Sequence, residues 1–309
     1  MTLPSERLFA RYRIETAFPL DYAAQVMAGE QSTGTFIRVA GETDELREAH
    51  AARVERIHEL ESVNAPSLPG AGQPKAANVW RRAELELSWP ISNMGASLPN
   101  VVATVAGNLF ELKPFSGLKL LDLTFPPAFL NRYQGPQFGV TGTRQLTGVF
   151  ERPLVGTIIK PSVGLSPEAT AAMVDSLAEG SIDFVKDDEL QADGPHCPFA
   201  QRLQAVMRVV NRHADRLGRQ LMYAVNITGE IDEMLARHDA VEAAGGTCVM
   251  VSVNSIGLPA LVALRQNSRL AIHGHRNGWG IYGRSPAIGM SYIAYQKLWR
   301  LAGVDHMHV

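Results

Sequence analysis

Two short apolar runs in the sequence end in charged residues. The first run ends at Lys160, and the second ends in the consecutive residues Lys186, Asp187, Asp188 and Glu189. Because the side chains of a strand alternate between its two faces, Lys186 and Asp188 point the same way and Asp187 points the other. An amine and two carboxylates would then meet beside a second lysine. This pattern predicts a hard-metal site next to a lysine that transfers protons.

The chemistry expected of this cluster follows from its residue types. Mg2+ prefers oxygen ligands, such as the carboxylates of Asp188 and Glu189, and tends to keep bound waters. Lys160 could act as a base or, when charged, as an acid, and either role works best with a pKa shifted towards neutrality. A lone run of charges is usually a solvated surface cluster. Its position after a strand favours the functional interpretation.

Two pairs of histidines are spaced two residues apart, so each pair shares one face of a strand. Such a pair could bind a metal, since imidazole is a common ligand. We expect His275 to be functional and His273 structural, and of His306 and His308 we favour His308. Arg276 and His308 are candidates for contacts to a phosphate or carboxylate, because a guanidinium forks onto such groups.

Other residues with reactive side chains favour structural roles. His213 and His238 lie in predicted helices and are expected to face solvent. His196 and Cys197 are adjacent, lie in a proline-flanked loop and make a poor nucleophile pair. Cys248 is expected to pack in a buried strand. The glycines at positions 278, 280 and 283 lack a full phosphate-loop pattern and favour a plain loop.

Residues 1–145 are predicted to form an α+β domain. Alternating or apolar runs predict strands at 8–16, 34–39 and 85–89, and helical spacing predicts helices at 19–28 and 45–61. Residues 64–77, rich in Pro, Gly and Ala, are predicted to be a loop. The apolar run at 100–109 fits either a strand or a helix.

Residues 146–309 are predicted to form a second domain in which strands and helices alternate. The expected strands are 155–160, 184–188, 221–226, 248–253, 270–275 and 304–308, and the expected helices are 167–179, 198–217, 230–244, 259–265 and 287–302. This alternation predicts right-handed crossovers and a parallel sheet. Polar strand ends favour a TIM barrel, which has eight strands where six are visible here. Either two β/α units are missing or the barrel interpretation is wrong.

Composition excludes several classes of protein. The 309 residues are 46% hydrophobic and 19% charged, with a net charge of −2, which favours neither nucleic acid nor an acidic membrane as a partner. No apolar run approaches the roughly 20 residues of a membrane helix. With two cysteines and no CxxC motif, a reducing cytoplasm fits better than a secreted disulfide scaffold.

Several segments resemble motifs of the RuBisCO large subunit, and more closely those of the RuBisCO-like proteins of form IV. The matching segments follow in the family's order over nearly the whole chain: 30–35 (ESSTGT in the family), 107–110 (GNxF), 156–166 (GTxxKPKxGLS), 182–189 (the KDDE strand), 273–276 (HxHR) and 303–308 (GxDHxH).

The resemblance implies an N-terminal α+β, ferredoxin-like domain followed by a TIM-type barrel. It implies that Lys186 reacts with CO2 to a carbamate, which binds Mg2+ together with Asp188 and Glu189. It also implies an antiparallel homodimer with the active site at the subunit interface. In the family, the segments that contain Glu30, Thr35 and Asn108 reach into the neighbouring subunit's barrel.

Departures from the family pattern argue against CO2 fixation. Ser162 replaces the second lysine of KPK, Phe36 replaces a tryptophan, and residues 277–280 replace the segment that carboxylases carry after HxHR. The lysine loop after strand six and the later phosphate-binding loops have no counterpart before Val309. The form of residues 275–280 resembles a branch that acts on 3-oxo-isoapionate 4-phosphate, as decarboxylases or carboxyl-transferring hydrolases.

The resulting expectation is a Mg2+-dependent enzyme that forms an enediolate from a phosphorylated keto-sugar acid, with Lys160, Lys186 and His275 as catalytic residues. The alternatives are a 2,3-diketo-5-methylthiopentyl-1-phosphate enolase and a catalytically silent barrel fragment. The direction in which the pKa of Lys186 is shifted stays open at this point. Burial would lower the pKa of Lys186, whereas the adjacent carboxylates would raise it.

Overall fold

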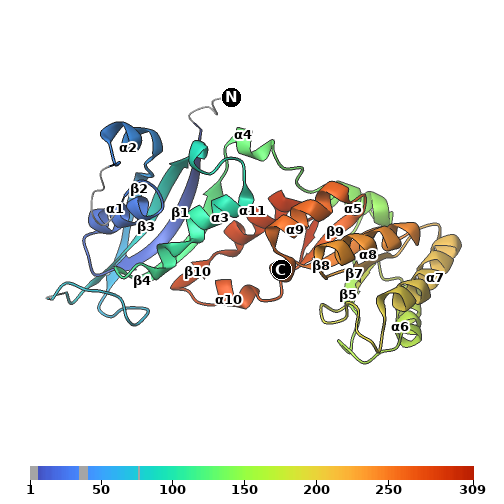
Figure 1. The fold of residues 1–309 in the computed structure, drawn as a ribbon. Coiled ribbons are helices and arrows are strands. Elements are labelled where there is room, and N and C mark those ends of the chain that lie inside the picture. The colour runs from blue at the N-terminus through green and yellow to red at the C-terminus, as the bar shows by residue number, and fades with distance from the viewer. Residues whose placement is uncertain (1–5, 35–40, 76) are drawn as a thin grey trace. The chain divides into compact units, whose positions relative to one another are not determined.

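The structure divides the chain into two compact units (Figure 1). It is a computed structural model that describes residues 6–34, 41–75 and 77–309. The first unit contains residues 1–133 and 278–298, and the second contains residues 134–277 and 299–309. The segment 278–298 therefore belongs by its contacts to the N-terminal unit, although it follows five strands of the second unit in sequence.

A mixed sheet organises the first unit. Its described strands are β1 (Arg7–Thr16), β2 (Arg53–Val63), β3 (Trp80–Pro90), β4 (Phe115–Thr124) and β10 (Ile288–Met290), in the order β10-β4-β1-β3-β2. β1 runs antiparallel to β3 and β4, and β10 is parallel to β4. The strands predicted at 8–16 and 85–89 are confirmed. The strand predicted at 34–39 lies almost entirely outside the described residues.

Strict alternation explains why the chain forms β1. Leu8, Ala10, Tyr12 and Ile14 are all buried, so one face of the strand is apolar and packs against helices. The Tyr12 hydroxyl donates a hydrogen bond to the carbonyl of Val105, at 2.8 Å. Val105 belongs to helix α3 (Leu98–Ala106), which therefore lies on this face.

Local signals also explain the helices of the first unit. Helix α1 (Leu20–Glu30) confirms the helix predicted at 19–28. Ser97 caps α3 by accepting a hydrogen bond from the backbone N–H of Asn100, and Pro99 suits the first helical turn. The ambiguous run at 100–109 is thus mainly helical. The shorter elements are η1 (Ile91–Asn93), η2 (Asn108–Glu111), α4 (Pro127–Leu130) and α10 (Trp279–Gly283).

The helix predicted at 45–61 is wrong over most of its length. Helix α2 spans only Asp44–His50, and β2 begins at Arg53. Val54, Ile57 and Leu60 are three residues apart, a spacing that imitates a helical face. Val54 and Ile57 nevertheless share a face of the strand, because its register with β3 shifts between Val54 and Arg56, and such bulges interrupt the alternation.

The helix predicted at 287–302 begins later than expected. Ile288, Gly289 and Met290 pair with residues 118–120 of β4, and helix α11 spans Tyr292–Ala302. A strand of three residues is too short to show a period in the sequence, which is why β10 is missed. Strand β4 was likewise not predicted from the sequence.

A curled parallel sheet forms the second unit as a half-barrel. Its described strands are β5 (Gly156–Ile158), β6 (Phe184–Lys186), β7 (Met222–Asn226), β8 (Cys248–Ser252), β9 (Ala271–His275) and β11 (His306–Met307), adjacent in that order. Its helices are α5 (Gly139–Thr147), α6 (Pro167–Glu179), α7 (Phe199–Leu217), α8 (Ile231–Ala243) and α9 (Val253–Asn267). The predicted α/β class and the six parallel strands are confirmed.

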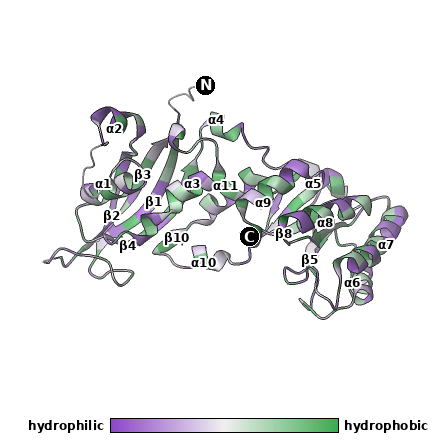
Figure 2. Cartoon of the chain, in the orientation of Figure 1, coloured by the Kyte–Doolittle hydropathy of each residue, from purple (hydrophilic) through white to green (hydrophobic). Residues whose placement is uncertain are grey.

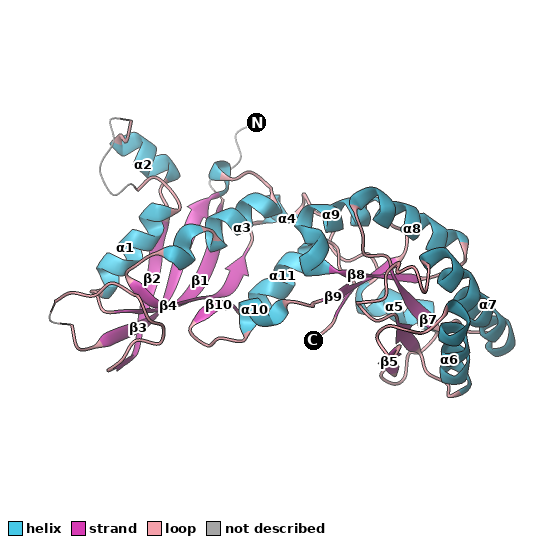
Figure 3. Ribbon diagram, turned by 60° about the horizontal axis from the view of Figure 1, so that its bottom comes forward, coloured by secondary structure: helices cyan, strands magenta, loops and turns pink. Residues whose placement is uncertain are grey.

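The sheet of the second unit is buried on both faces, as parallel sheets usually are. Every residue of β7, β8 and β9 is buried. Helices lie outside the strands (Figure 3), and α7 turns a green, apolar side and a purple, polar side in different directions (Figure 2). None of the helices in the described part of the chain has the length and apolar character needed to span a bilayer.

Helix α5 and the residue before it pack against the apolar side chains of the half-barrel. Met222, Ala224, Cys248, Met250 and Ala271 form a buried cluster, against which pack the side chains of Phe138, Leu146 and Phe184. The predicted burial of Cys248 is confirmed.

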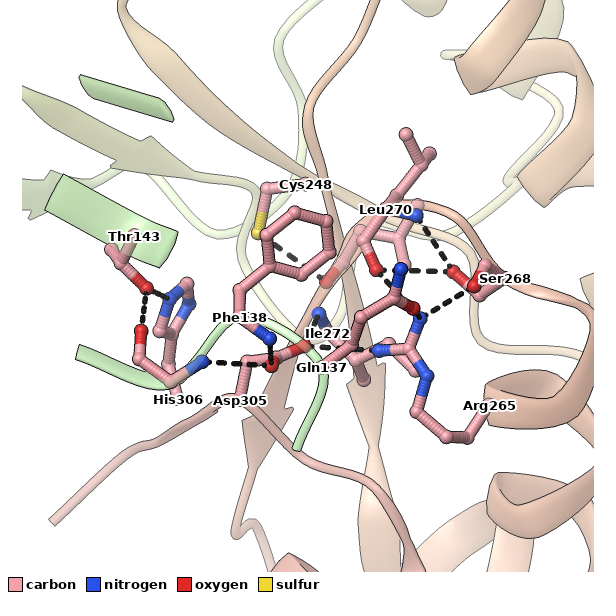
Figure 4. Close-up of polar contacts among 12 residues, drawn as sticks. Gln137, Phe138, Thr143, Cys248, Arg265, Ser268, Leu270, Ile272, Asp305 and His306 are labelled. Atoms are coloured by element: carbon pink, nitrogen blue, oxygen red, sulfur yellow. Dashed lines mark hydrogen bonds and ion pairs between the residues drawn. The ribbon is translucent and has the colours of Figure 1, made fainter. Parts of the chain in front are cut away.

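Asp305 anchors the start of α5 to this sheet (Figure 4). Its buried carboxylate accepts hydrogen bonds from the backbone N–H groups of Phe138, at 2.6 Å, and Ile272, at 2.9 Å. It also pairs with the buried Arg265, at 3.0 Å. The lower end of the half-barrel is thereby fixed, and the opposite ends of the strands are left for the polar residues.

Candidate active site

The polar side chains predicted from the sequence converge at the carboxyl ends of the parallel strands. Lys160 follows β5, Lys186 ends β6, His275 ends β9 and His308 follows β11. In α/β barrels this end of the sheet carries the active site. Asp188 and Glu189 follow β6 and join the same cluster through the contacts described below.

Lys160 forms an ion pair with the first carboxylate. Its Nζ lies 2.6 Å from Oδ2 of Asp188 and 2.9 Å from Oγ of Ser162. The side chain is 60% exposed. The hydrogen bond to Asp188 raises the pKa of Lys160, opposite to the shift towards neutrality that the sequence analysis considered optimal. In this arrangement Lys160 is an ammonium group and a proton donor.

Lys186 is buried beside the second carboxylate. Its Nζ donates to the carbonyl of Asp187 at 2.9 Å and lies 3.9 Å from Oε2 of Glu189. Burial lowers the pKa of Lys186 and outweighs the opposite effects of Glu189 and Asp188. Burial thus decides the balance left open by the sequence, and it shifts Lys186 towards the neutral amine, which is the form that reacts with CO2.

Asp188 and Glu189 present their carboxylates on the same side as these amines. Burial alone would raise the pKa of Asp188, but the hydrogen bonds from Lys160 and from the backbone N–H of Leu190 outweigh it and lower that pKa. Oε2 of Glu189 lies 3.4 Å from Nε2 of His275. Two carboxylates and a buried amine with a lowered pKa fit a Mg2+ site that is completed by a lysine carbamate.

Asp187 points away from this cluster, as strand alternation predicts. Its carboxylate accepts hydrogen bonds from the Tyr223 hydroxyl, from Nε of Arg202 at 3.2 Å and from the backbone N–H of Asn226 at 2.9 Å. All four residues are buried. This network fastens the end of β6 to β7 and α7.

Asn226 continues that support directly behind the two carboxylates. Its Nδ2 donates to the backbone carbonyls of Asp188, at 3.1 Å, and Glu189, at 3.2 Å. The sequence analysis names Asn226 only as the last residue of a strand. Its position at a polar strand end was the signal that could have identified it, whereas Arg202 and Tyr223 gave no such signal.

The histidines form a ladder along β9 and β11. His275 and His308 stack with ring centroids 4.9 Å apart, and burial with the nearby charge of Lys186 lowers the pKa of His275 to about 4. His273 packs against Phe184 at 5.2 Å, and burial lowers its pKa well below the usual value. Neither ring nitrogen of His273 has a hydrogen-bond partner within the described residues. His306 contacts Thr143 at 2.6 Å.

The remaining predicted contacts are distributed over both units. Nε of Arg276 is buried and, in the described parts of the chain, has no hydrogen-bond partner. Glu30 ends α1 and Asn108 begins η2, both in the first unit. Thr35 lies outside the described residues. The predicted reach of these three residues into a neighbouring subunit stays a prediction.

The expectation that His213 and His238 face solvent is wrong, since both are buried. Nε2 of His213 lies 2.6 Å from Oδ1 of Asp175, and Arg216 donates to its Nδ1 at 2.9 Å. Both histidines lie on the inner sides of their helices, which the helical positions alone did not reveal. Cys197 is also buried, with Nε2 of Gln191 3.0 Å from its Sγ.

Two family models match the chain. The catalytic domain of the ribulose bisphosphate carboxylase large chain matches residues 139–309, and its N-terminal domain matches residues 4–129. A 3-oxo-isoapionate-4-phosphate transcarboxylase/hydrolase from Xanthobacter autotrophicus is 57% identical, over 99% of this chain and 73% of the relative. A 3-oxo-isoapionate-4-phosphate decarboxylase from Rhizobium etli is 40% identical, over 96% of this chain and 71% of the relative.

Solved structures share the fold over nearly the whole chain. A RuBisCO-like protein from Burkholderia fungorum superimposes with a TM-score of 0.90 at 47% identity, covering 98% of this chain and 72% of that one. A dimeric archaeal RuBisCO from Hyperthermus butylicus superimposes with a TM-score of 0.85 at 30% identity, covering 100% of this chain and 69% of that one.

Proposed function

The chain belongs to the family of the ribulose bisphosphate carboxylase large chain, and we propose that it is a RuBisCO-like enzyme acting on 3-oxo-isoapionate 4-phosphate rather than a CO2-fixing carboxylase. The names of the two relatives support this substrate. The higher identity to the transcarboxylase/hydrolase, 57% against 40%, favours carboxyl transfer with hydrolysis over simple decarboxylation.

The observation that carries the proposal is the pairing of Lys160 with Asp188 at 2.6 Å beside the buried Lys186. One lysine is held as an ammonium group, and the other is biased towards a neutral amine. Two lysines with opposite pKa shifts at adjoining strand ends are typical of a site that moves protons. The two lysines could therefore take different roles within one site, Lys160 as a charged group and Lys186 as an amine.

The reaction starts from a 3-oxo acid, whose carboxyl group is next but one to a ketone. The bond between the carboxyl carbon and its neighbour breaks, and its electron pair passes into an enediolate that includes the former ketone. The carboxyl group leaves as CO2. In simple decarboxylation the Lys160 ammonium then gives a proton to the carbon that lost the carboxyl group, as a general acid. In carboxyl transfer the electron pair of the enediolate instead forms a bond from its other carbon to the CO2.

Lys186 as a carbamate, Asp188 and Glu189 would hold Mg2+ at this site. When bound, Mg2+ supplies Lewis-acid stabilisation of the negative charge that develops on the substrate oxygens. The chain itself holds the two carboxylate residues in place. Nδ2 of Asn226 donates to the backbone carbonyls of Asp188 and Glu189, and the Asp187 carboxylate accepts a hydrogen bond from the backbone N–H of Asn226.

Three further residues would bind and orient the substrate. Burial favours the uncharged form of His275 by lowering its pKa, so it can donate or accept a hydrogen bond without carrying charge. Arg276 has a buried Nε available for a phosphate or carboxylate oxygen, to which a guanidinium binds in a fork. His308, stacked on His275, would contact the same end of the substrate.

The active unit is proposed to be a homodimer, as in the dimeric relative from Hyperthermus butylicus. Asn108, Glu30 and Thr35 of one protomer would then lie near the strand ends of its partner. Sedimentation of the purified protein tests the dimer, and Asn108→Ala is expected to lower activity without changing the oligomeric state.

The test of function is an assay with 3-oxo-isoapionate 4-phosphate and Mg2+, in which substrate loss and CO2 release are both measured. Loss of substrate with less than equimolar CO2 supports carboxyl transfer, and equimolar CO2 supports a decarboxylase. Preference for 2,3-diketo-5-methylthiopentyl 1-phosphate would instead establish the enolase. No turnover of either compound would leave the catalytically silent chain.

A further inference from the structure

Ser252 is the last residue of β8, at the same end of the sheet as the candidate active site. It is the direct register partner of His275 on β9, and neighbouring strands lie about 4.8 Å apart. Met250 and Cys248, two and four residues before it, belong to the cluster that fills the inside of the half-barrel. Because strand side chains alternate, Ser252 faces the same interior one rung above Met250.

The hydroxyl group of Ser252 is buried, and the described part of the protein offers it no hydrogen-bond partner. The residue is 2% exposed, and no described residue forms a hydrogen bond with its Oγ. Its backbone N–H donates to Oγ1 of Thr228 at 3.0 Å, which fixes the strand end. Buried hydroxyl groups are normally paired, because leaving one unpaired costs free energy.

Three other buried hydroxyl groups of this unit have hydrogen-bond partners. Thr147 donates to the carbonyl of Thr143, at 3.0 Å, and Thr170 donates to that of Ser166, at 2.9 Å. Ser268 donates to the carbonyl of Leu270 at 3.1 Å. The hydroxyl group of Ser252 thus stands out from these at a strand end where substrate is proposed to bind.

Two more polar atoms without partners lie at the end of the adjoining strand. Nε of Arg276 and Oδ1 of Asn277 are buried and, as far as the structure describes the chain, make no hydrogen bonds. Asn277 is itself held in place, because Nδ2 of Asn254 donates to its carbonyl at 2.6 Å. A donor, an acceptor and a hydroxyl group are therefore unmatched at the ends of β8 and β9.

We propose that Ser252 is a substrate-binding residue, whose hydroxyl group forms a hydrogen bond with a hydroxyl or carboxylate oxygen of a phosphorylated hydroxy acid. This inference rests on the proposed function, because it assigns a new residue to the same site. A neutral hydroxyl group suits this class of ligand, since it can donate to a carboxylate or exchange hydrogen bonds with a ligand hydroxyl.

The chain offers a matched control on the same strand. Thr247 directly precedes β8 at its opposite end, and its Oγ1 is also buried without a partner among the described side chains and backbone. Ser252→Ala and Thr247→Val each remove one such hydroxyl group. If a buried hydroxyl group without a partner only destabilises the fold, the two variants should show the same changes in Tm, KM and kcat.

The experiment compares KM, kcat and Tm of the full-length variants with 3-oxo-isoapionate 4-phosphate. Ser252→Ala is expected to raise KM about tenfold, equivalent to about 1.4 kcal/mol, with a smaller change in kcat and a Tm that is unchanged or higher. Ser252→Thr, which keeps a hydroxyl group, should restore much of the lost affinity. Thr247→Val should leave KM unchanged.

Several results would overturn the assignment. They are an unchanged KM in Ser252→Ala, an equal KM change in Thr247→Val, and a lower Tm in Ser252→Ala alone, which would show that the hydroxyl group supports the fold. If the wild-type protein does not turn the substrate over, the proposed function fails separately. Binding of 3-phosphoglycerate and erythronate 4-phosphate by calorimetry then decides the inference: about tenfold weaker binding to Ser252→Ala supports it, and equal or absent binding rejects it.

Discussion

Nζ of Lys160 and Oδ2 of Asp188 lie 2.6 Å apart although the residues are 28 positions apart in sequence and come from neighbouring strands. The carboxylate proposed to bind Mg2+ thus also sets the charge of the proposed acid. A change at either residue should alter both functions, and a change at a residue that holds the strand end should alter both more weakly.

Replacing Lys160 with methionine is expected to lower kcat by about 10²–10⁴-fold, the usual contribution of a general acid or base. The Lys160 side chain is 60% exposed, but the variant leaves the buried Asp188 carboxylate without its ion partner, so the Tm should also fall. Turnover of 3-oxo-isoapionate 4-phosphate and a thermal melt measure the two effects. Lys113→Met, at an exposed lysine of the first unit, is the control, and a comparable kcat loss there would refute the assignment.

Replacing Lys186 with glutamine is expected to abolish the CO2-dependent part of Mg2+ binding. The glutamine keeps a polar side chain of similar length but has no amine to react with CO2. Titration calorimetry with and without bicarbonate measures the difference in Mg2+ affinity. Removal of Mg2+ with EDTA should stop turnover by the wild-type enzyme. Mg2+ affinity that is independent of bicarbonate in the wild type would argue against a carbamate.

Replacing Asp187 with alanine is expected to destabilise the fold by about 3–5 kcal/mol, since it leaves the buried Arg202 without its carboxylate. Chemical denaturation measures the loss. Asp193→Ala is the matched control, because Asp193 pairs with Arg237 near the surface, where an ion pair contributes about 0–1 kcal/mol. Equal losses in the two variants would contradict a special role for the Asp187 network.

The free energy of unfolding is expected to decrease when the pH drops below about 6.5, the pKa of a histidine in an unfolded chain. Burial lowers the pKa of His273 in the folded state, so the unfolded state binds more protons and stability rises with pH. The contribution is complete above pH 6.5 and is lost progressively as the pH falls towards the lowered pKa.

The variant His273→Leu isolates this residue from the other buried histidines. It should reduce the slope of stability against pH by up to about 1.4 kcal/mol per pH unit, the effect of one proton. Urea denaturation at several pH values between 5 and 7.5 gives the slope. His58→Leu, on β2 of the first unit, serves as the control, and an identical slope in wild type and His273→Leu would refute the prediction.

The sequence predicts most of the second unit because most of its elements have a strong local signal, although helix α5 was not predicted. Ser166 caps α6 by accepting a hydrogen bond from the N–H of Ala169, and Pro167 follows it. Strand ends such as Lys186 and His275 were visible as charge after an apolar run. Alternation also gave the correct direction for Asp187, whose partners face away from the site.

The failures share one physical cause, which is that they depend on contacts between distant residues. The helix predicted at 45–61 becomes β2 because β3 offers a partner edge. His213 is buried because α7 packs against α6, where the Asp175 carboxylate accepts a hydrogen bond from its Nε2. The raised pKa of Lys160 arises from Asp188 on another strand. None of these partners can be read from the local sequence.

The pairing of β10 with β4 has a consequence during synthesis on the ribosome. Lys119 of β4 donates to the carbonyl of Gly283, which is 164 residues later in the chain. At about 5–20 residues per second, β4 would wait roughly 10–30 s for its last neighbour. Until then its outer edge carries unpaired backbone groups, which invite association with other nascent chains. Chaperone demand should therefore be greatest while the second unit is being translated.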